Sequence, residues 1–326
     1  MTGKAMTTLH IPDHVHLLGP QRLHPTLRPA LDRAQIGDRI ATITGGWEER
    51  EGEDEELRSH VARDVVDLRI WGRLEGVFAA DSELRAAMQE RYDRIRVLRR
   101  LYQRQLAHAL ASARELLTTH DGWCEDLYEL ATEASIDAVR IIDRKHREHV
   151  ADIHTAFRER LDPSRHPELE RQRDEIRATL ETCSALCIAG GHVAILLNRM
   201  RALGVLDHWG ARPIFAWSAG AMVLCDDIVL FHDRPPQGAG DAELLEPGFG
   251  LVKDIVVLPH AKRRLRLDDP MRVALFARRF APARAIALDD GACLEARQNV
   301  LTHVDGSSRL EEDGSVVLLQ TSGSAA

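Results

Sequence analysis

The sequence has little cysteine and no long apolar run. Its five cysteines are an odd number without a CxxC pair, and most lie in apolar segments. This argues against a disulfide framework or a cysteine metal centre, so we expect buried free thiols. No run approaches the roughly 18 apolar residues that span a bilayer, and the polar N-terminus lacks the apolar core of a signal peptide. We therefore expect a cytoplasmic protein without a membrane span, and nothing in the sequence implies a metal or a cofactor.

An excess of basic residues is also missing. The 43 Lys and Arg against 51 Asp and Glu give a net charge of −8, which opposes general attraction to nucleic acid or to an anionic membrane. Gly45-Gly46 is not followed by the Lys-Ser/Thr that ends a phosphate loop, so it predicts only a tight turn. What is present is a 44% hydrophobic content, enough for the core of one large α/β domain or two smaller ones.

Short strands and helices alternate in the first quarter of the chain. Strands are predicted at 14–18, 39–44 and 65–70, with helices at 25–34 and 57–61 between them. The alternation resumes with an apolar strand at 184–189. It predicts an α/β fold with a mostly parallel sheet flanked by helices.

The region between these two parts has helical periodicity only. Apolar residues recur at a spacing near 3.7 from Ala79 to Thr118, and a second stripe runs from Trp123 to Leu161. A short turn between them predicts a long inserted antiparallel helical hairpin, followed by a charged helix at 168–181. We therefore divide the chain into residues 1–78 as the first part of the α/β domain, 79–181 as the helical insertion and 182–326 as the second part, which carries the catalytic motifs.

One segment of the second part has the pattern of a nucleophile elbow. An apolar strand ends at Trp217, Ser218 follows, and the small residues Ala216 and Gly220 stand two positions on either side. The turn from strand to helix at such an elbow is so sharp that larger side chains at these positions would collide. The alternative is that Ser218 only caps the following helix, a position that serine favours.

Other residues of the required types also follow predicted strands. In a parallel sheet the loops at the carboxyl ends of the strands form the active crevice, and these loops carry Gly190-Gly191, Ser218 and His260. Neutral His260 is a base for the serine, and Asp233, in the loop after the next strand, is a candidate to orient it. The Gly191 and Ala219 amides are candidate donors to an oxyanion. Asp289 and Asp290 are interpreted as part of a turn between strands rather than as a second acid.

The motifs resemble peptidase family S51, which comprises aspartyl dipeptidase (peptidase E) and the cyanophycinases. The resemblance rests on Gly190-Gly191-His192, Ala216 to Ala221, Pro259-His260 and Ala287 to Gly291. It implies a class I glutamine amidotransferase-like fold without a counterpart for residues 79–181 in the compact members.

The resemblance also implies roles for individual residues. Ser218 corresponds to the nucleophile, His260 to the base and Asp233 to the peptidase E acid, for which Asp226, Asp227 or Glu243 are alternatives. Ala216 replaces the usual glycine, and His192 stands where asparagine or aspartate is common in a substrate contact. Arg264 and Arg266 match arginines suited to an acidic substrate side chain, although solvated surface arginines would give the same pattern.

The leading hypothesis is a serine hydrolase that cleaves a peptide or isopeptide amide in a small, aspartyl-containing substrate. The alternatives are an α/β-hydrolase esterase, an inactive amidotransferase-like scaffold that binds a ligand, and a partner-binding protein that acts through its helical insertion. The esterase is disfavoured because the catalytic histidine of an α/β-hydrolase usually lies near the end of the chain, whereas some 66 residues follow His260. A hairpin tip with Trp123, Leu127 and Tyr128 further suggests a homodimer through the insertion, and the alternative is a self-contained hairpin that only covers the active site.

Overall fold

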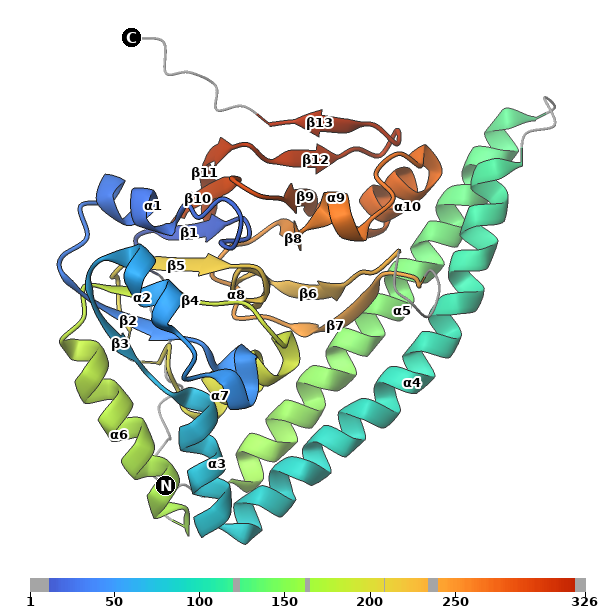
Figure 1. Ribbon diagram of the computed structural model, residues 1–326. Coiled ribbons are helices and arrows are strands. Elements are labelled where there is room, and N and C mark those ends of the chain that lie inside the picture. The colour runs from blue at the N-terminus through green and yellow to red at the C-terminus, as the bar shows by residue number, and fades with distance from the viewer. Residues whose placement is uncertain (1–11, 120–123, 162–164, 208, 234–239, 320–326) are drawn as a thin grey trace.

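Seven strands form the main sheet of the computed structural model, which describes residues 12–119, 124–161, 165–207, 209–233 and 240–319 (Figure 1). Its order is β11-β10-β1-β5-β4-β2-β3, and the five strands from β1 to β3 in this order run parallel. These are β1 (Val15–Leu18), β5 (Ile214–Trp217), β4 (Ala185–Ile188), β2 (Arg39–Ile43) and β3 (Asp64–Asp67). The last two strands, β10 (Cys293–Arg297) and β11 (Val300–Asp305), are antiparallel. The predicted α/β class with a mostly parallel sheet is confirmed.

Two smaller sheets lie beside the main one. The first has the order β13-β12-β9-β8, and within it β8 and β9 run parallel. The second pairs β6 with β7 in antiparallel fashion. Their bounds are β8 (Ile255–Pro259), β9 (Arg284–Leu288), β12 (Ser308–Leu310), β13 (Val316–Leu318), β6 (Asp227–Leu230) and β7 (Glu243–Pro247).

Alternate residues of the main strands point into two separate apolar clusters. Leu18, Phe215 and Trp217 face the cluster that includes α1 (Leu27–Arg33) and α2 (Glu55–Val61). Leu17 and Ala216 face the larger cluster. This second cluster contains residues of α3 (Ile70–Ala80), α7 (Val193–Ala202), α8 (Ala219–Leu224) and α10 (Pro270–Phe280). A sheet covered on both faces explains why its central strands are almost entirely apolar.

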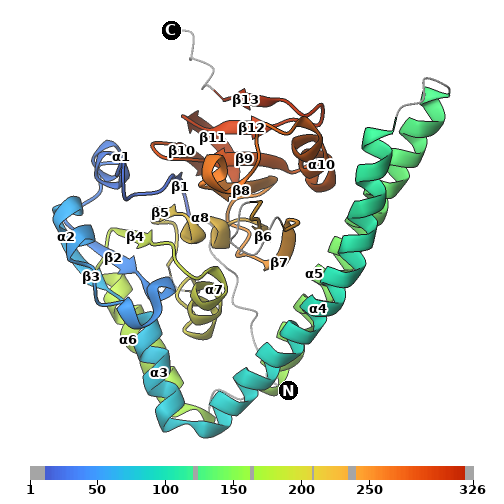
Figure 2. The same cartoon turned by 45° about the vertical axis from the view of Figure 1, so that its right-hand side comes forward.

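The helical region consists of α4 (Ser82–Thr118), α5 (Glu125–Arg160) and α6 (Pro167–Glu181). Helices α4 and α5 run side by side as an antiparallel hairpin, and the end at Thr118 and Glu125 stands away from the rest of the chain (Figures 1 and 2). Asp81 caps α4, since its carboxylate accepts a hydrogen bond from the Leu84 amide at 2.8 Å. Trp123 lies outside the described residues.

Helix α5 does not pack as its apolar pattern predicts. The apolar stripe of this helix includes Ala131, Ala134, Ala138 and Ile142, but the first and last are only half-buried and the middle two are exposed. The buried face instead carries Thr132, Ile136, Val139, Asp143, His146, Val150, His154 and Phe157. The physical cause is that three polar residues of this face, Asp143, His146 and His154, bind the α/β part of the chain.

Asp143 is the centre of that contact. Its carboxylate accepts hydrogen bonds from the Tyr102 hydroxyl at 2.7 Å and from Nε and a terminal nitrogen of Arg279 at 2.7 and 2.8 Å. Arg279 also donates to the Ala242 carbonyl, and the Leu244 amide donates to Tyr102. Asp143 and Arg279 are both buried, so the hairpin is joined to α10 and β7 by a charged pair in the interior.

One predicted boundary was wrong, and two strands were not predicted. The strand expected at 65–70 ends at Asp67, and residues 70–80 form α3 before the long helix begins. The stretch between His232 and Gly250 is rich in Pro, Gly and acidic residues, which predicts a loop, but it contains β7. Near the end of the described chain, β12 was not predicted; it pairs with β9 and β13. A 3-10 helix, η1 (Gly45–Arg50), occupies the predicted Gly45-Gly46 turn, and α9 (Ala261–Arg264) follows β8. None of the helices in the described ranges is long and apolar enough to cross a membrane.

Candidate active site

Ser218 connects β5 directly to α8. Its backbone has φ 54° and ψ −123°, a conformation that a residue with a side chain rarely adopts. Such strain is typical of a serine at a nucleophile elbow, where a sharp turn presents the hydroxyl at the carboxyl edge of the sheet. An ordinary N-cap has extended backbone and a side chain that accepts from the helix, and Ser218 shows neither feature.

The residues around Ser218 are small because the backbone is crowded there. A Cβ on Gly220 would lie 2.3 Å from the Ile188 carbonyl oxygen, and one on Gly190 would lie 2.6 Å from Ser218 Cβ. Both distances are too short for real atoms, so glycine is required at 190 and 220 unless the backbone moves. Ala216, the departure from the family pattern, is fully buried in β5.

His260 follows the last residue of β8 and has left-handed backbone, with φ 57°. Its Nε2 lies 3.4 Å from Ser218 Oγ, at the outer limit of a hydrogen bond. Burial is the main reason that the pKa of His260 is lowered from 6.5, and the nearby Arg264 guanidinium lowers it further. The imidazole is therefore neutral at pH 7, as a base that removes the serine proton must be.

Asp290 is the carboxylate whose charge raises the pKa of His260, against the effects of burial, Arg264 and Arg263. The two residues come close because β8 and β9 are parallel neighbours with Pro259 opposite Leu288. The next residues of each strand therefore leave the same edge. Asp289 accepts a hydrogen bond from the Lys262 amide at 3.1 Å, which fixes this turn to the start of α9.

The loop after β4 lies against the elbow. The ideal Cβ of Gly190 is 3.3 Å from the Ala219 amide nitrogen, and Gly191 has φ 113° with a Cβ position only 2.2 Å from the Gly46 carbonyl oxygen. The His192 amide donates to that same oxygen at 2.7 Å. The loops after β2 and β4 are thus packed together beside Ser218, and the backbone next to its hydroxyl carries no side chain.

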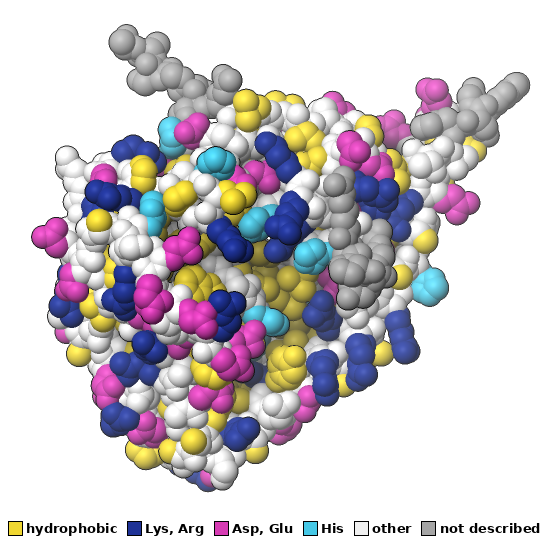
Figure 3. All heavy atoms as spheres, viewed as in Figure 1, with side chains coloured by type: hydrophobic (Ala, Val, Ile, Leu, Met, Phe, Trp, Pro, Cys, Tyr) yellow, Lys and Arg dark blue, Asp and Glu magenta, His cyan; other side chains and the backbone are white. Residues whose placement is uncertain are grey.

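The molecular surface is hollowed over α8 and β6, and Lys, Arg and His side chains gather around this hollow (Figure 3). Arg264 is half-buried, and among the described residues no carboxylate forms an ion pair with it. Arg266 is exposed. His192 is exposed as well, and its Nδ1 accepts from the Ile195 amide at 3.3 Å, so its ring caps α7.

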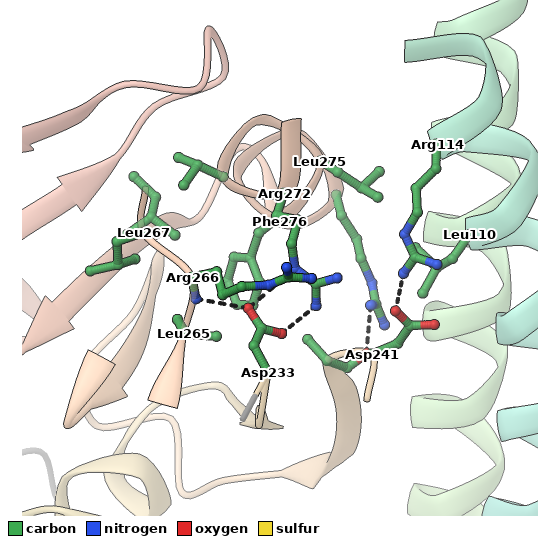
Figure 4. A pocket seen from close by; sticks show the side chains of 14 residues that line it. Leu110, Arg114, Asp233, Asp241, Leu265, Arg266, Leu267, Arg272, Leu275 and Phe276 are labelled. Atoms are coloured by element: carbon green, nitrogen blue, oxygen red, sulfur yellow. Dashed lines mark hydrogen bonds and ion pairs between the residues drawn. The ribbon is translucent and has the colours of Figure 1, made fainter. Parts of the chain in front are cut away.

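Asp233 lies in a different environment. Its carboxylate accepts from the Arg266 amide at 3.0 Å and from Arg272 Nε at 3.2 Å, with a second bond to a terminal nitrogen of Arg272. Figure 4 shows these contacts in a pocket between α10 and α4, which Arg114 and Leu110 also line. Neither Ser218 nor His260 lines this pocket. The structure therefore brings Ser218 and His260 together and directs Asp233 towards Arg272.

The three alternative acids are also engaged elsewhere. Asp226 accepts from the Asp254 amide, Asp227 pairs with Arg147, and Glu243 binds Arg99 and Gln103 of α4. Sequence reasoning missed Asp290 as a neighbour of the histidine. The available signal was that strands 255–259 and 284–288 follow one another with a helix between them, as parallel neighbours do.

A strained serine between a strand and a helix, with a neutral histidine beside its hydroxyl, is the arrangement of a serine hydrolase on an α/β sheet. Residues 138–304, about half of the chain, match the sequence profile of peptidase family S51. The chain belongs to this family and is a serine-type peptidase.

Two solved structures are similar over most of their length. A peptidase from an acI-B1 Actinobacterium is 11% identical, with 96% of each chain covered and a TM-score of 0.46. A candidate peptidase E from Listeria monocytogenes EGD-e is 10% identical, with 92% of this chain and 99% of that chain covered and a TM-score of 0.43. Among curated proteins, no match was found.

Proposed function

We propose that Ser218 is the nucleophile and His260 the general base in the hydrolysis of a peptide or isopeptide amide. His260 Nε2 takes the hydroxyl proton as Ser218 Oγ attacks the carbonyl carbon. It then gives this proton to the leaving amine, so that the carbon–nitrogen bond breaks and an acyl-serine remains. Water deprotonated by His260 attacks the acyl-serine, which releases the acid and restores the hydroxyl. The observation that carries the proposal is the strained Ser218 backbone with His260 Nε2 at 3.4 Å.

The amides of Gly191 and Ala219 are proposed to bind the oxyanion of the tetrahedral intermediate. Ala219 is the first residue of α8, so its amide nitrogen has no partner within the helix. Gly191 has no side chain to keep the substrate away. Two such donors act most strongly where water is excluded, because the charge develops next to fixed dipoles.

For the third catalytic residue we propose Asp290 in place of Asp233. The Asp290 charge raises the pKa of His260, whereas the Asp233 carboxylate is already bound by Arg272 and the Arg266 amide. The proposed role is to stabilise the imidazolium that forms when His260 accepts the serine proton.

The substrate proposed is a short peptide with an acidic side chain. Arg264 supports this, because its half-buried guanidinium lies close enough to His260 to lower the pKa of the imidazole, and no carboxylate of the described ranges pairs with it. A substrate carboxylate would supply the missing partner. Arg266 and His192, both exposed near the site's loops, are proposed as weaker contacts for the rest of the substrate.

The test is a panel of Asp-X dipeptides, β-aspartyl peptides, cyanophycin-like polymers and matching neutral peptides. Wild type is expected to cleave at least one acidic class in preference to its neutral counterpart, and Ser218→Ala to cleave none. Arg264→Gln should raise KM for the acidic substrate while leaving KM for a neutral ester unchanged. Equal cleavage of acidic and neutral peptides by wild type would contradict the acidic specificity, and cleavage by Ser218→Ala would contradict the mechanism.

We also propose that the hairpin tip is the contact surface of a homodimer. Leu127 and Leu130 of α5 are 58% and 71% exposed although both are large and apolar. Light scattering should give a dimer for wild type and a monomer for Leu127→Glu with Leu130→Glu, while Leu23→Glu, at another exposed leucine, stays dimeric. A monomeric wild type, or a dimer that survives the double change, would reject this surface.

A further inference from the structure

Two histidines and a glutamate face one another across β1 and β10. His14 precedes β1 and His16 lies within it, so the two project from the same face of the sheet. Glu295 of β10 is paired directly with His16. One ligand atom from each of the three residues lies within 4.8 Å of the others, and His14 Nδ1 is 3.1 Å from Glu295 Oε1.

His16 has a buried ring nitrogen without a hydrogen-bond partner among the described residues. The residue is 7% exposed, its ring stacks on Phe215 at 4.3 Å, and Nε2 has no hydrogen-bond partner in the described part of the chain. A buried ring nitrogen without a partner is unfavourable in the interior. Burial also lowers the pKa of His16 to about 4, so its imidazole is neutral and can donate a lone pair at physiological pH.

The Glu295 carboxylate is only partly used. His14 and Arg297 both bind Oε1, and none of the hydrogen bonds found within the described ranges involves Oε2. Two arginines lie close enough to affect the charges of this site. Arg297 lowers the pKa of Glu295, and Arg33 lowers the pKa of His16. An incoming metal ion therefore has to compete with Arg297 for the carboxylate.

From this geometry we propose that His14, His16 and Glu295 bind one divalent transition-metal ion of the Zn²⁺ type. Two imidazoles and one carboxylate are ligands that Zn²⁺ favours, at roughly 2.0–2.2 Å from the metal. Ligands this close to one ion lie at most about 4.4 Å apart, so a pair near the 4.8 Å limit would reach this separation by a small side-chain rotation. The ion would join β1 to β10, where the parallel part of the sheet meets its antiparallel edge.

This site is separate from the proposed active site. His16 pairs with Phe215, three residues before Ser218 in the direction of β5, and Phe215 faces the α1 side of the sheet. The site belongs to the amino end of the strand, whereas Ser218 leaves the carboxyl end. We therefore expect the metal to stabilise the fold rather than to take part in hydrolysis.

The test is zinc titration calorimetry on the full chain after treatment with a chelator, together with thermal unfolding with and without Zn²⁺. The His260→Ala background removes the catalytic histidine as a competing ligand. One Zn²⁺ per chain and a rise in Tm are expected, because binding to the folded state alone stabilises it. Loss of an outer partner of a metal site weakens binding about 10- to 100-fold, so loss of a direct ligand in Glu295→Gln or His16→Phe should weaken it at least tenfold.

His16→Phe keeps the stacking on Phe215, and Glu295→Gln keeps the size of a half-buried side chain. If one variant fails to fold, the zinc affinity of the other still tests the site. His24→Ala, at an exposed histidine, is the matched control and should bind like the parent. The proposal is overturned if the parent binds no zinc, or if Glu295→Gln and His24→Ala bind it equally well.

Discussion

Asp233 and Arg272 form a partly buried ion pair that ties the loop after β6 to the start of α10. The Asp233 side chain is 7% exposed. Its Oδ2, which accepts from Arg272 Nε, also accepts a hydrogen bond from the Arg266 amide. These contacts give the residue a structural role at the edge of the active-site region. These contacts are the reason why we propose Asp290, and not Asp233, as the acid that acts on His260.

Exchanging each acid for its amide separates the two roles. Asp233→Asn should lower the free energy of unfolding by about 1–3 kcal/mol, as loss of charged hydrogen bonds does, while kcat stays near wild type. Asp290→Asn should lower kcat by at least about tenfold, because the imidazolium loses its counter-charge, with stability unchanged for this exposed residue. Urea denaturation and steady-state kinetics on the same samples decide. The reverse assignment of effects would return the catalytic role to Asp233.

The pH dependence of kcat/KM should follow the charges around His260. The base works only when neutral, so activity falls as the pH drops through the pKa of His260, which lies below 6.5. Arg264→Gln removes a charge that lowers this pKa and should move the acid limb to higher pH. Asp290→Asn removes the charge that raises it and should move the limb to lower pH.

Lys262→Gln is the control for these shifts, because this residue of the same helix is not among the charges that act on His260. Its profile should match that of wild type. Shifts of the same sign in Arg264→Gln and Asp290→Asn would mean that the limb reports another group.

Backbone strain at Ser218 predicts an unusual stability effect. A residue held at φ 54° and ψ −123° stores about 1–3 kcal/mol of backbone strain, which glycine would release. Glycine also stabilises the unfolded chain by about 0.5–1 kcal/mol, because it has greater conformational freedom there. Ser218→Gly should therefore be more stable than Ser218→Ala by about 1 kcal/mol, although both lack the hydroxyl. Urea denaturation of the two variants measures the difference, and a glycine variant no more stable than the alanine variant would count against a strained elbow.

The buried Asp143–Arg279 pair should dominate the docking of the hairpin. Asp143→Asn leaves the Arg279 charge buried without a full partner, which costs about 3–5 kcal/mol in comparable sites. Asp137→Asn, in an exposed pair with Arg140 on the same helix, should cost less than about 1 kcal/mol. Equal losses in denaturation experiments would show that the interior pair does not hold the hairpin in place.

The features that could be predicted from the sequence are those that local sterics and apolar patterns determine. Small residues around Ser218, and Ser218 and His260 directly after apolar strands, were enough to predict that the two come close together. They were not enough to show that β8 belongs to the smaller sheet rather than to the main one. The α4 stripe was predicted in part. Leu84, Met88, Tyr102, Leu106 and Leu110 are buried as its apolar spacing predicts, but Tyr92 of the same spacing is 49% exposed.

The remaining features depend on polar partners that are distant in sequence. Asp233 is bound by Arg272, and nothing in the spacing of the acids distinguishes that contact from one with His260. The buried face of α5 was misjudged because Asp143, His146 and His154 are polar, and a search for apolar periodicity passes over them. Their partners are Tyr102, Arg279, Glu246 and the Leu245 carbonyl.

Labelling of the intact chain with a fluorophosphonate probe tests most directly whether Ser218 is an activated nucleophile. Wild type should gain one covalent adduct, which peptide mass spectrometry finds on Ser218. Ser218→Ala should gain none, His260→Ala should react much more slowly, and Ser59→Ala, at an exposed serine elsewhere, should react like wild type. Equal labelling of wild type and Ser218→Ala, or no labelling of wild type at high probe concentration, would contradict the assignment.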